Sequence, residues 1–152
     1  MIEISSPIFA IARHRFNVDG TGVVTLVTSY GCPLRCKYCL NQICWQKPTS
    51  RSWRTPEELY NEVKKDELYY ITTNGGVTFG GGEPMLRAEF IREFRKLCGS
   101  LWKIRLETSL CANVDILSQL VPVVDEWIID IKSISDTRVS HPSHATSACS
   151  IS

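Results

Sequence analysis

The fold is decided by an uncharged stretch that leads directly into a cysteine loop, Gly22-Val23-Val24-Thr25-Leu26-Val27-Thr28-Ser29-Tyr30 followed by Gly31-Cys32-Pro33-Leu34-Arg35-Cys36-Lys37-Tyr38-Cys39. The first part is rich in β-branched residues and stops at a glycine, which is typical of a buried β-strand. The sequence therefore predicts a strand over 22–30, with three cysteines in the loop at its carboxyl end.

Helices and further strands alternate along the chain beyond this loop. Thr55 and Glu58 form a capping box with Pro56 in the first turn, which predicts a helix to about residue 70. Apolar residues at helical spacing predict a second helix over 85–98, and Asn113 caps a third that ends at residue 120. Strands are predicted over 76–79, 103–107 and 126–131. Because the connections are short, the fold class is α/β with a parallel sheet of about four strands.

Composition describes an ordinary globular protein and excludes some classes of function. The chain has 152 residues, of which 43% are hydrophobic and 22% charged. A formal net charge of +1 gives no electrostatic reason to expect nucleic acid or a membrane as partner. Neither a secretory signal nor a membrane-spanning stretch is visible, so we expect a cytoplasmic protein.

The carboxyl-terminal residues differ from the rest of the chain. Residues 133–152 contain seven serines and no aromatic residue. Such a composition buries too little apolar surface to hold a fold. We therefore expect one core domain over 1–136 and a serine-rich, disordered tail over 137–152.

Each predicted strand is followed by polar or glycine residues. The three runs beyond the cysteine loop are Gly80-Gly81-Gly82-Glu83-Pro84, Glu107-Thr108-Ser109 and Asp130-Ile131-Lys132. Sites in parallel α/β folds lie at the carboxyl ends of the strands. The sequence therefore predicts that these runs and the cysteine loop form one site.

The spacing Cys-x3-Cys-x2-Cys points to a metal centre. Thiolates favour an iron–sulfur cluster or zinc, and three of them leave one coordination position open for chemistry. Cys44 follows Cys39 by five residues and offers an alternative. With Cys44 as a fourth ligand, the site becomes a closed zinc-binding or electron-transfer module, for which Cys44 is essential.

The cysteine loop, together with Gly81-Gly82-Glu83 about 40 residues later, resembles the radical S-adenosylmethionine (SAM) superfamily. Within that superfamily the chain resembles the glycyl-radical-enzyme activases of the pyruvate formate-lyase activase type. The residues that carry this resemblance are Val18-Asp19-Gly20, Tyr38-Cys39-Leu40-Asn41, Gly75-Gly76-Val77-Thr78-Phe79 and Asp130-Ile131-Lys132. The fold implied is a partial parallel (β/α) barrel of radical SAM type, truncated after the fourth strand relative to the six-stranded form.

The resemblance implies a role for each part of the site. Cys32, Cys36 and Cys39 bind three irons of a 4Fe-4S cluster, whose fourth iron is chelated by S-adenosyl-L-methionine. Gly81, Gly82 and Glu83 hold the amino group of SAM, and the backbone of Tyr38, Cys39 and Leu40 meets its adenine. The SAM carboxylate and a neighbouring monovalent cation are lined by Glu107, Thr108, Asp130, Ile131 and Lys132.

The implied activity is reductive cleavage of SAM to a 5′-deoxyadenosyl radical, which generates a glycyl radical on a partner enzyme. The implied partners are a glycyl radical enzyme as protein substrate and a flavodoxin or ferredoxin as electron donor, in an anaerobic setting. An activase of anaerobic ribonucleotide reductase uses the same cysteine spacing and is an alternative, although Glu83 favours the formate-lyase type. A non-catalytic truncated remnant is another alternative.

The chain departs from the activase pattern in two motifs. Glu107 stands where these activases usually have aspartate, so the carboxylate is one methylene longer. The run from Asp19 to Val24 lacks the proline and the arginine of the corresponding activase motif. We expect the longer carboxylate of Glu107 to displace the cation.

Overall fold

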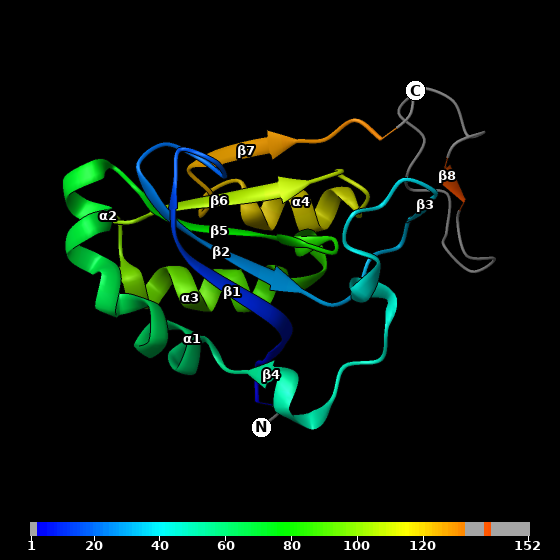
Figure 1. Ribbon diagram of the computed structural model, residues 1–152, viewed down its shortest axis with the longest axis horizontal. Coiled ribbons are helices and arrows are strands. Elements are labelled where there is room, and N and C mark those ends of the chain that lie inside the picture. The colour runs from blue at the N-terminus through cyan, green and yellow to red at the C-terminus, as the bar shows by residue number, and fades with distance from the viewer. Residues whose placement is uncertain (1–2, 133–138, 141–152) are drawn as a thin grey trace.

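The structure, a computed structural model, describes residues 3–132 and 139–140 and is built around a six-stranded sheet with the order β4-β1-β2-β5-β6-β7 (Figure 1). The strands are β1 (Ser6–Phe16), β2 (Val23–Ser29), β3 (Arg35–Cys36), β4 (Trp53–Arg54), β5 (Gly76–Gly81), β6 (Lys103–Thr108), β7 (Glu126–Ile129) and β8 (Val139–Ser140). The α-helices are α1 (Pro56–Val63), α2 (Glu67–Thr73), α3 (Ala88–Cys98) and α4 (Val114–Leu120). Short 3-10 helices are η1 (Gln42–Trp45), η2 (Ser50–Ser52), η3 (Lys64–Asp66) and η4 (Pro84–Arg87).

The centre of the sheet is the parallel part. Strands β2, β5, β6 and β7 pair in parallel, with Ser29 opposite Gly81 and Thr108 opposite Ile129 at their ends. The four arrowheads therefore point the same way in Figure 1. This confirms the predicted α/β fold with an open, partial barrel, and it brings the residues that follow these strands to one edge of the sheet.

Two strands of the sheet were missed by the sequence analysis. Strand β1 pairs antiparallel with β2, and the two-residue strand β4 pairs antiparallel with β1. The alternation that would reveal β1 is interrupted by register shifts between Ile8 and Ala10 and between Ala12 and Arg15. Because a bulge puts two residues of one strand opposite one residue of its partner, the period of two that marks a strand is lost there.

Several predicted boundaries also differ from the structure. The helix predicted over 85–98 begins at Ala88, because Pro84–Arg87 form η4. The helix expected over 55–70 is divided into α1 and α2 by η3, and it extends to Thr73. Strand β7 ends at Ile129, two residues before the predicted end. In the tail, Val139 and Ser140 pair with Cys36 and Arg35 as β8 and β3, whereas the disorder expected for 137–138 and 141–152 lies outside the described residues.

The hydrophobic core lies between the sheet and the helices. Helix α3 packs between α1 and α4 and buries Phe90, Ile91 and Phe94 against the sheet. Trp102 is fully buried, with its ring stacked on Tyr60 at a centroid distance of 5.4 Å. Large buried aromatic side chains contribute strongly to stability, so this layer fixes the helices on one face. Among the described residues, no helix is long and apolar enough to cross a membrane.

A buried carboxylate joins β1 to the helical layer at the opposite end from the cysteine loop. Asp66 is 1% exposed and accepts hydrogen bonds from Arg13 at 2.6 and 2.7 Å and contacts His14 at 2.8 Å. The hydrogen bond from Arg13 makes the largest contribution to the lowered pKa of Asp66. The ionised carboxylate is therefore favoured by the folded state.

We expect Asp66→Asn to lower the free energy of unfolding by about 2 kcal/mol, because it leaves Arg13 without its charged partner. The contribution of Asp66 is complete above about pH 4, the usual pKa of aspartate, and is lost as the pH falls through the lower folded pKa. Urea unfolding at pH 7 and pH 3 measures both effects. The exposed Glu3→Gln is the matched control and should change stability by less than about 0.5 kcal/mol; equal effects of the two substitutions would contradict the assignment.

Candidate functional site

A cavity of about 260 Å³ lies at the carboxyl ends of the parallel strands. Its lining comes from the cysteine loop and from the residues that follow β5, β6 and β7. The lining residues are Cys32, Leu34, Cys36, Tyr38, Cys39, Leu40, Asn41, Cys44, Trp45, Gly81, Gly82, Glu83, Glu107, Thr108, Ser109, Asp130 and Lys132. Every residue that the sequence assigned to the site is among them except Ile131, which is 68% exposed.

The cysteine loop is held in place by its own backbone and by Arg35. The amide of Gly31 donates to the carbonyl of Cys44 at 2.8 Å, which closes the loop at its base. The Arg35 guanidinium donates to the carbonyl of Cys32 at 2.9 Å and lies 5.1 Å from the centre of the Trp45 ring. These contacts restrain the loop before any ligand is bound. Trp45 was missed by the sequence analysis, and its place beside the cysteines in the chain was the only available signal.

The thiols gather at one end of the molecule but do not form a closed metal-binding arrangement. Leu34 and Cys36 are buried, and Cys32 and Cys39 pack against them. Burial makes the largest contribution to the raised pKa values of the Cys32 and Cys36 thiols. It is also the main reason why the pKa of Cys44 is raised to about 12. Within residues 3–132, no three His, Cys, Asp or Glu side chains are grouped closely enough to hold a metal ion. Loading a metal therefore requires deprotonation and an adjustment of the loop.

Not all cysteines of this region are free thiols. Cys32, Cys36, Cys39 and Cys44 are free, whereas Cys111, which packs against Leu34 and Cys36, is disulfide-bonded. The four thiols that line the cavity remain available as ligands.

The carboxylate of Glu83 is directed at the end of β6. It accepts hydrogen bonds from the Ser109 amide at 3.0 Å, the Ser109 hydroxyl at 2.7 Å and the Thr108 hydroxyl at 2.5 Å. It also accepts from the Met85 amide at 3.2 Å and thereby caps the start of η4. Glu83 is 1% exposed, so these donors replace water around its charge. The side chain thus joins β5 to β6, and the backbone of this segment remains to contact a ligand.

Gly81 and Gly82 allow the end of β5 to approach the start of the cysteine loop. The φ angle of Gly81 is +90°, a conformation that favours glycine. A Cβ atom on Gly82 would lie 2.1 Å from the carbonyl oxygen of Gly31. The amide of Glu83 donates to that same carbonyl at 2.8 Å. The glycines therefore serve first to bring two strand ends into contact.

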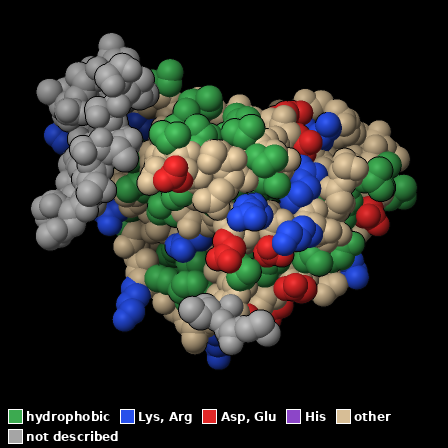
Figure 2. Space-filling model, turned by 180° about the vertical axis from the view of Figure 1, so that it is seen from behind, with side chains coloured by type: hydrophobic (Ala, Val, Ile, Leu, Met, Phe, Trp, Pro, Cys, Tyr) green, Lys and Arg blue, Asp and Glu red, His purple; other side chains and the backbone are tan. Residues whose placement is uncertain are grey.

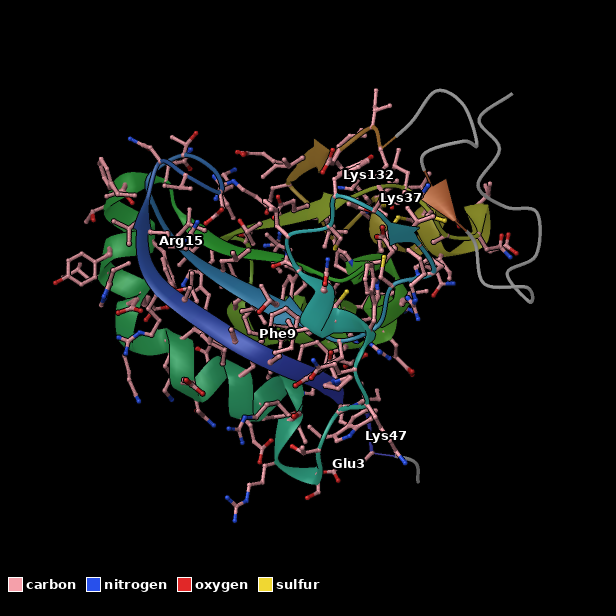
Figure 3. All side chains as sticks on the ribbon, turned by 45° about the vertical axis from the view of Figure 1, so that its right-hand side comes forward. Glu3, Phe9, Arg15, Lys37, Lys47 and Lys132 are labelled. Carbon is pink, nitrogen blue, oxygen red and sulfur yellow. The ribbon has the colours of Figure 1, made fainter. Side chains whose placement is uncertain are left out.

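Charged side chains from β6 and β7 complete the cavity wall. Burial makes the largest contribution to the raised pKa of Glu107, and the charges of Asp19 and Asp130 raise this pKa further. Lys132 pairs with Asp130, and the hydroxyl of Tyr38 donates to the carbonyl of Lys132. In Figure 3, Lys132 and Lys37 are labelled where yellow sulfur atoms gather. The cysteine loop thus contacts the chain just after β7.

The fold and this site together define a class. The molecule is an α/β protein with an incomplete parallel barrel and a thiol-lined cavity at the carboxyl ends of its strands. The sequence profile of the radical SAM superfamily matches residues 26–147. The chain belongs to this superfamily.

Characterised relatives narrow the similarity further. The chain is 32% identical over 129 residues to a pyruvate formate-lyase-activating enzyme of Listeria monocytogenes, covering 80% of this chain and 51% of that protein. It is 42% identical over 81 residues to one of Clostridium pasteurianum, covering 53% and 34%. It is 32% identical over 125 residues to the pyruvate formate-lyase 1-activating enzyme of Escherichia coli K12, covering 78% and 49%. The chain spans about half the length of the Listeria and Escherichia proteins.

We expect Glu83→Gln to lower the free energy of unfolding by about 2 kcal/mol, because an amide presents two donors to a site built from donors. Glu107→Gln is the matched control from the same cavity. Its charge is disfavoured by burial and by nearby carboxylates, so neutralising it should leave stability at pH 7 unchanged or slightly higher. Urea unfolding measures the change in the free energy of unfolding for both variants. A Glu83→Gln variant as stable as wild type would show that the four hydrogen bonds of this carboxylate contribute little to stability.

Proposed function

We propose that this chain cleaves SAM reductively at a 4Fe-4S cluster and generates a glycyl radical on a partner enzyme. The observation that carries the proposal is the convergence of four segments on one cavity. The cysteine loop, the Gly81–Glu83 turn, the end of β6 and the segment after β7 are far apart in sequence and line the same space. This arrangement supports a site that holds a metal centre and a small molecule side by side.

The residues of the cavity fit the two groups that the superfamily implies. Three thiols in a short loop are the soft ligands that an iron–sulfur cluster takes. Carboxylates, hydroxyls and an ammonium on the opposite wall suit a zwitterionic amino acid with a ribose. When bound, the cluster and SAM supply a one-electron reduction that yields a 5′-deoxyadenosyl radical.

The remaining roles belong to side chains of this chain. Cys32, Cys36 and Cys39 would hold the cluster, and the backbone of Gly81 and Gly82 would meet the amino group of SAM. The adenine would lie against the backbone of Tyr38, Cys39 and Leu40. The hydroxyl of Thr108 donates a hydrogen bond to Glu83, so Thr108 acts as a positioning residue for the Gly81–Glu83 turn. Asp130, Lys132 and the exposed Ile131 would lie toward the carboxylate end of SAM.

The acidic wall also supports a monovalent cation beside SAM. Burial raises the pKa of Glu107 most, and the charges of Asp19 and Asp130 raise it further, whereas those of Lys132 and Arg15 lower it. A cation in this position would relieve the repulsion between these carboxylates. We include it in the proposal as a ligand of Glu107 and Asp130.

The proposed protein substrate is a glycyl radical enzyme. The relatives from Listeria, Clostridium and Escherichia are named for activating pyruvate formate-lyase. Their similarity supports the same reaction type for this chain, with a backbone glycine of the partner as hydrogen donor. The electron would come from a flavodoxin or ferredoxin.

A second candidate rests on Cys44. This thiol is 2% exposed, lines the cavity and lies close to Cys32 and Cys39. With Cys44 as fourth ligand the cavity would hold zinc in a closed tetrahedral site, without affinity for SAM. The two candidates differ in which cysteines they require.

The test is anaerobic reconstitution with iron and sulfide, followed by dithionite and SAM, with 5′-deoxyadenosine measured by mass spectrometry. We expect Cys32→Ala, Cys36→Ala and Cys39→Ala each to lose product by at least about 100-fold, because each removes a cluster ligand. Cys44→Ala is the matched control and should retain iron, absorbance and product. Loss of metal binding in Cys44→Ala, with zinc preferred over iron in wild type, would overturn the proposal in favour of the closed site.

A further inference from the structure

Trp45 carries a buried hydrogen-bond donor without an acceptor. Its indole lines the cavity of the candidate site together with Cys32, Cys36 and Cys39. The Nε1 atom is shut off from solvent, and it has no hydrogen-bond partner in the part of the chain that the structure describes. A buried polar group left in this state costs about 1–3 kcal/mol, so its presence in the cavity wall calls for an explanation.

This donor differs from the other buried side-chain donors that lack a partner. Among the described residues these are one nitrogen of Arg87 and one of Arg105, and neither residue lines the cavity. Each of the two guanidinium groups makes other hydrogen bonds, to the carbonyl of Tyr30 and to the carboxylate of Glu126. An indole has only one donor, so for Trp45 the whole polar capacity of the side chain is unused.

The backbone carbonyls just before Trp45 already accept hydrogen bonds. The carbonyl of Ile43 accepts from the Gln46 amide at 3.0 Å. The carbonyl of Cys44 accepts from the Gly31 amide at 2.8 Å. The free thiols of the same cavity are only weak acceptors, but a thiolate bound to a metal is charged and accepts strongly. A metal centre in the cavity would therefore bring the acceptor that the indole lacks.

Arg35 restrains the indole ring and strengthens its donor. On the face of the molecule seen from behind, Figure 2 shows charged side chains of both signs close together at the surface. The guanidinium of Arg35 instead donates to the carbonyls of Cys32 and Leu34, at 2.9 and 3.2 Å, and lies over the Trp45 ring. A cation over the ring draws electron density from the indole, which makes the N–H a better donor.

We propose that the indole N–H of Trp45 donates a hydrogen bond to a sulfur atom of the iron–sulfur cluster and raises the reduction potential of the cluster. The reduced cluster carries one more negative charge than the oxidised one, so a donor to its sulfur atoms stabilises the reduced state more. This inference rests on the proposed function, since it assumes a cluster held by Cys32, Cys36 and Cys39.

The test removes the N–H in two ways. Trp45→Phe keeps an aromatic ring beneath Arg35, and replacement of Trp45 by β-(3-benzothienyl)alanine keeps the size of the indole with sulfur in place of the N–H. Trp53→Phe is the matched control, because Trp53 lies on β4, is 43% exposed and does not line the cavity. The full chain is reconstituted anaerobically with iron and sulfide. Its reduction potential is then measured by a redox titration followed by electron paramagnetic resonance.

We expect both replacements of Trp45 to lower the equilibrium constant for one-electron reduction about tenfold, which is a shift of about 59 mV to lower potential. Iron and sulfide contents should equal those of wild type, because the three ligands are retained, and Trp53→Phe should leave the potential unchanged. An unchanged potential in the benzothienylalanine form would overturn the proposal. An equal shift in Trp53→Phe would overturn it too, since the effect would then not come from the cavity.

The protein without metal gives a second readout. If the N–H has no partner there, the benzothienylalanine form should unfold at the same urea concentration as wild type or at a higher one. A clearly lower midpoint would show that the indole already has an acceptor in the metal-free chain, which contradicts the proposal.

The failure of this inference is distinguishable from the failure of the proposed function. If wild type assembles a cluster but yields no 5′-deoxyadenosine with dithionite and SAM, the proposed function fails, and the potentials still decide the role of Trp45. If product forms and the potential does not depend on the N–H, the function stands and the role given to Trp45 is wrong. A wild-type chain that assembles no cluster would overturn both.

Discussion

The arrangement of the site depends on the buried carboxylate of Glu83. It follows β5, and three of its four hydrogen bonds come from Thr108 and Ser109 at the end of β6. A fully buried charge is tolerated only when its lone pairs are satisfied, so the two strand ends must keep this position. The amide of Glu83 in turn holds the carbonyl of Gly31 at the base of the cysteine loop. Three of the four segments that line the cavity are therefore connected through a single residue.

The sequence predicted the parallel part of this fold because its inner strands β2, β5 and β6 are mostly buried, whereas the edge strand β7 is only half-buried. β2, β5, β6 and β7 read as short uncharged or alternating runs, each closed by a glycine or a polar turn. β1 was missed because its bulges break the period of two, and because Arg13 and His14 lie within it. Both residues contact the buried Asp66, a partner 52 or more positions away that no local pattern reveals.

The sequence predicted which residues form the site, but it did not predict the contacts between them. The strand-end rule and the resemblance to radical SAM activases brought together the cysteines, the glycine turn and the residues after β6 and β7. The direction of the Glu83 side chain was not predictable, since a carboxylate after two glycines reads equally well as a ligand-binding group. Its partners are fixed by the register of β5 against β6, which is a property of the folded sheet.

Charge on the cysteine loop follows from the same division between inside and outside. Arg35 is drawn to the carbonyls of Cys32 and Leu34 and to the ring of Trp45, so its charge helps to shape the loop. Lys37, two residues later, is exposed and adds nothing to that restraint. Five of the twenty residues from 35 to 54 are basic and none is acidic. The side chains of this segment thus divide between those that restrain the loop, such as Arg35, and those that face solvent, such as Lys37.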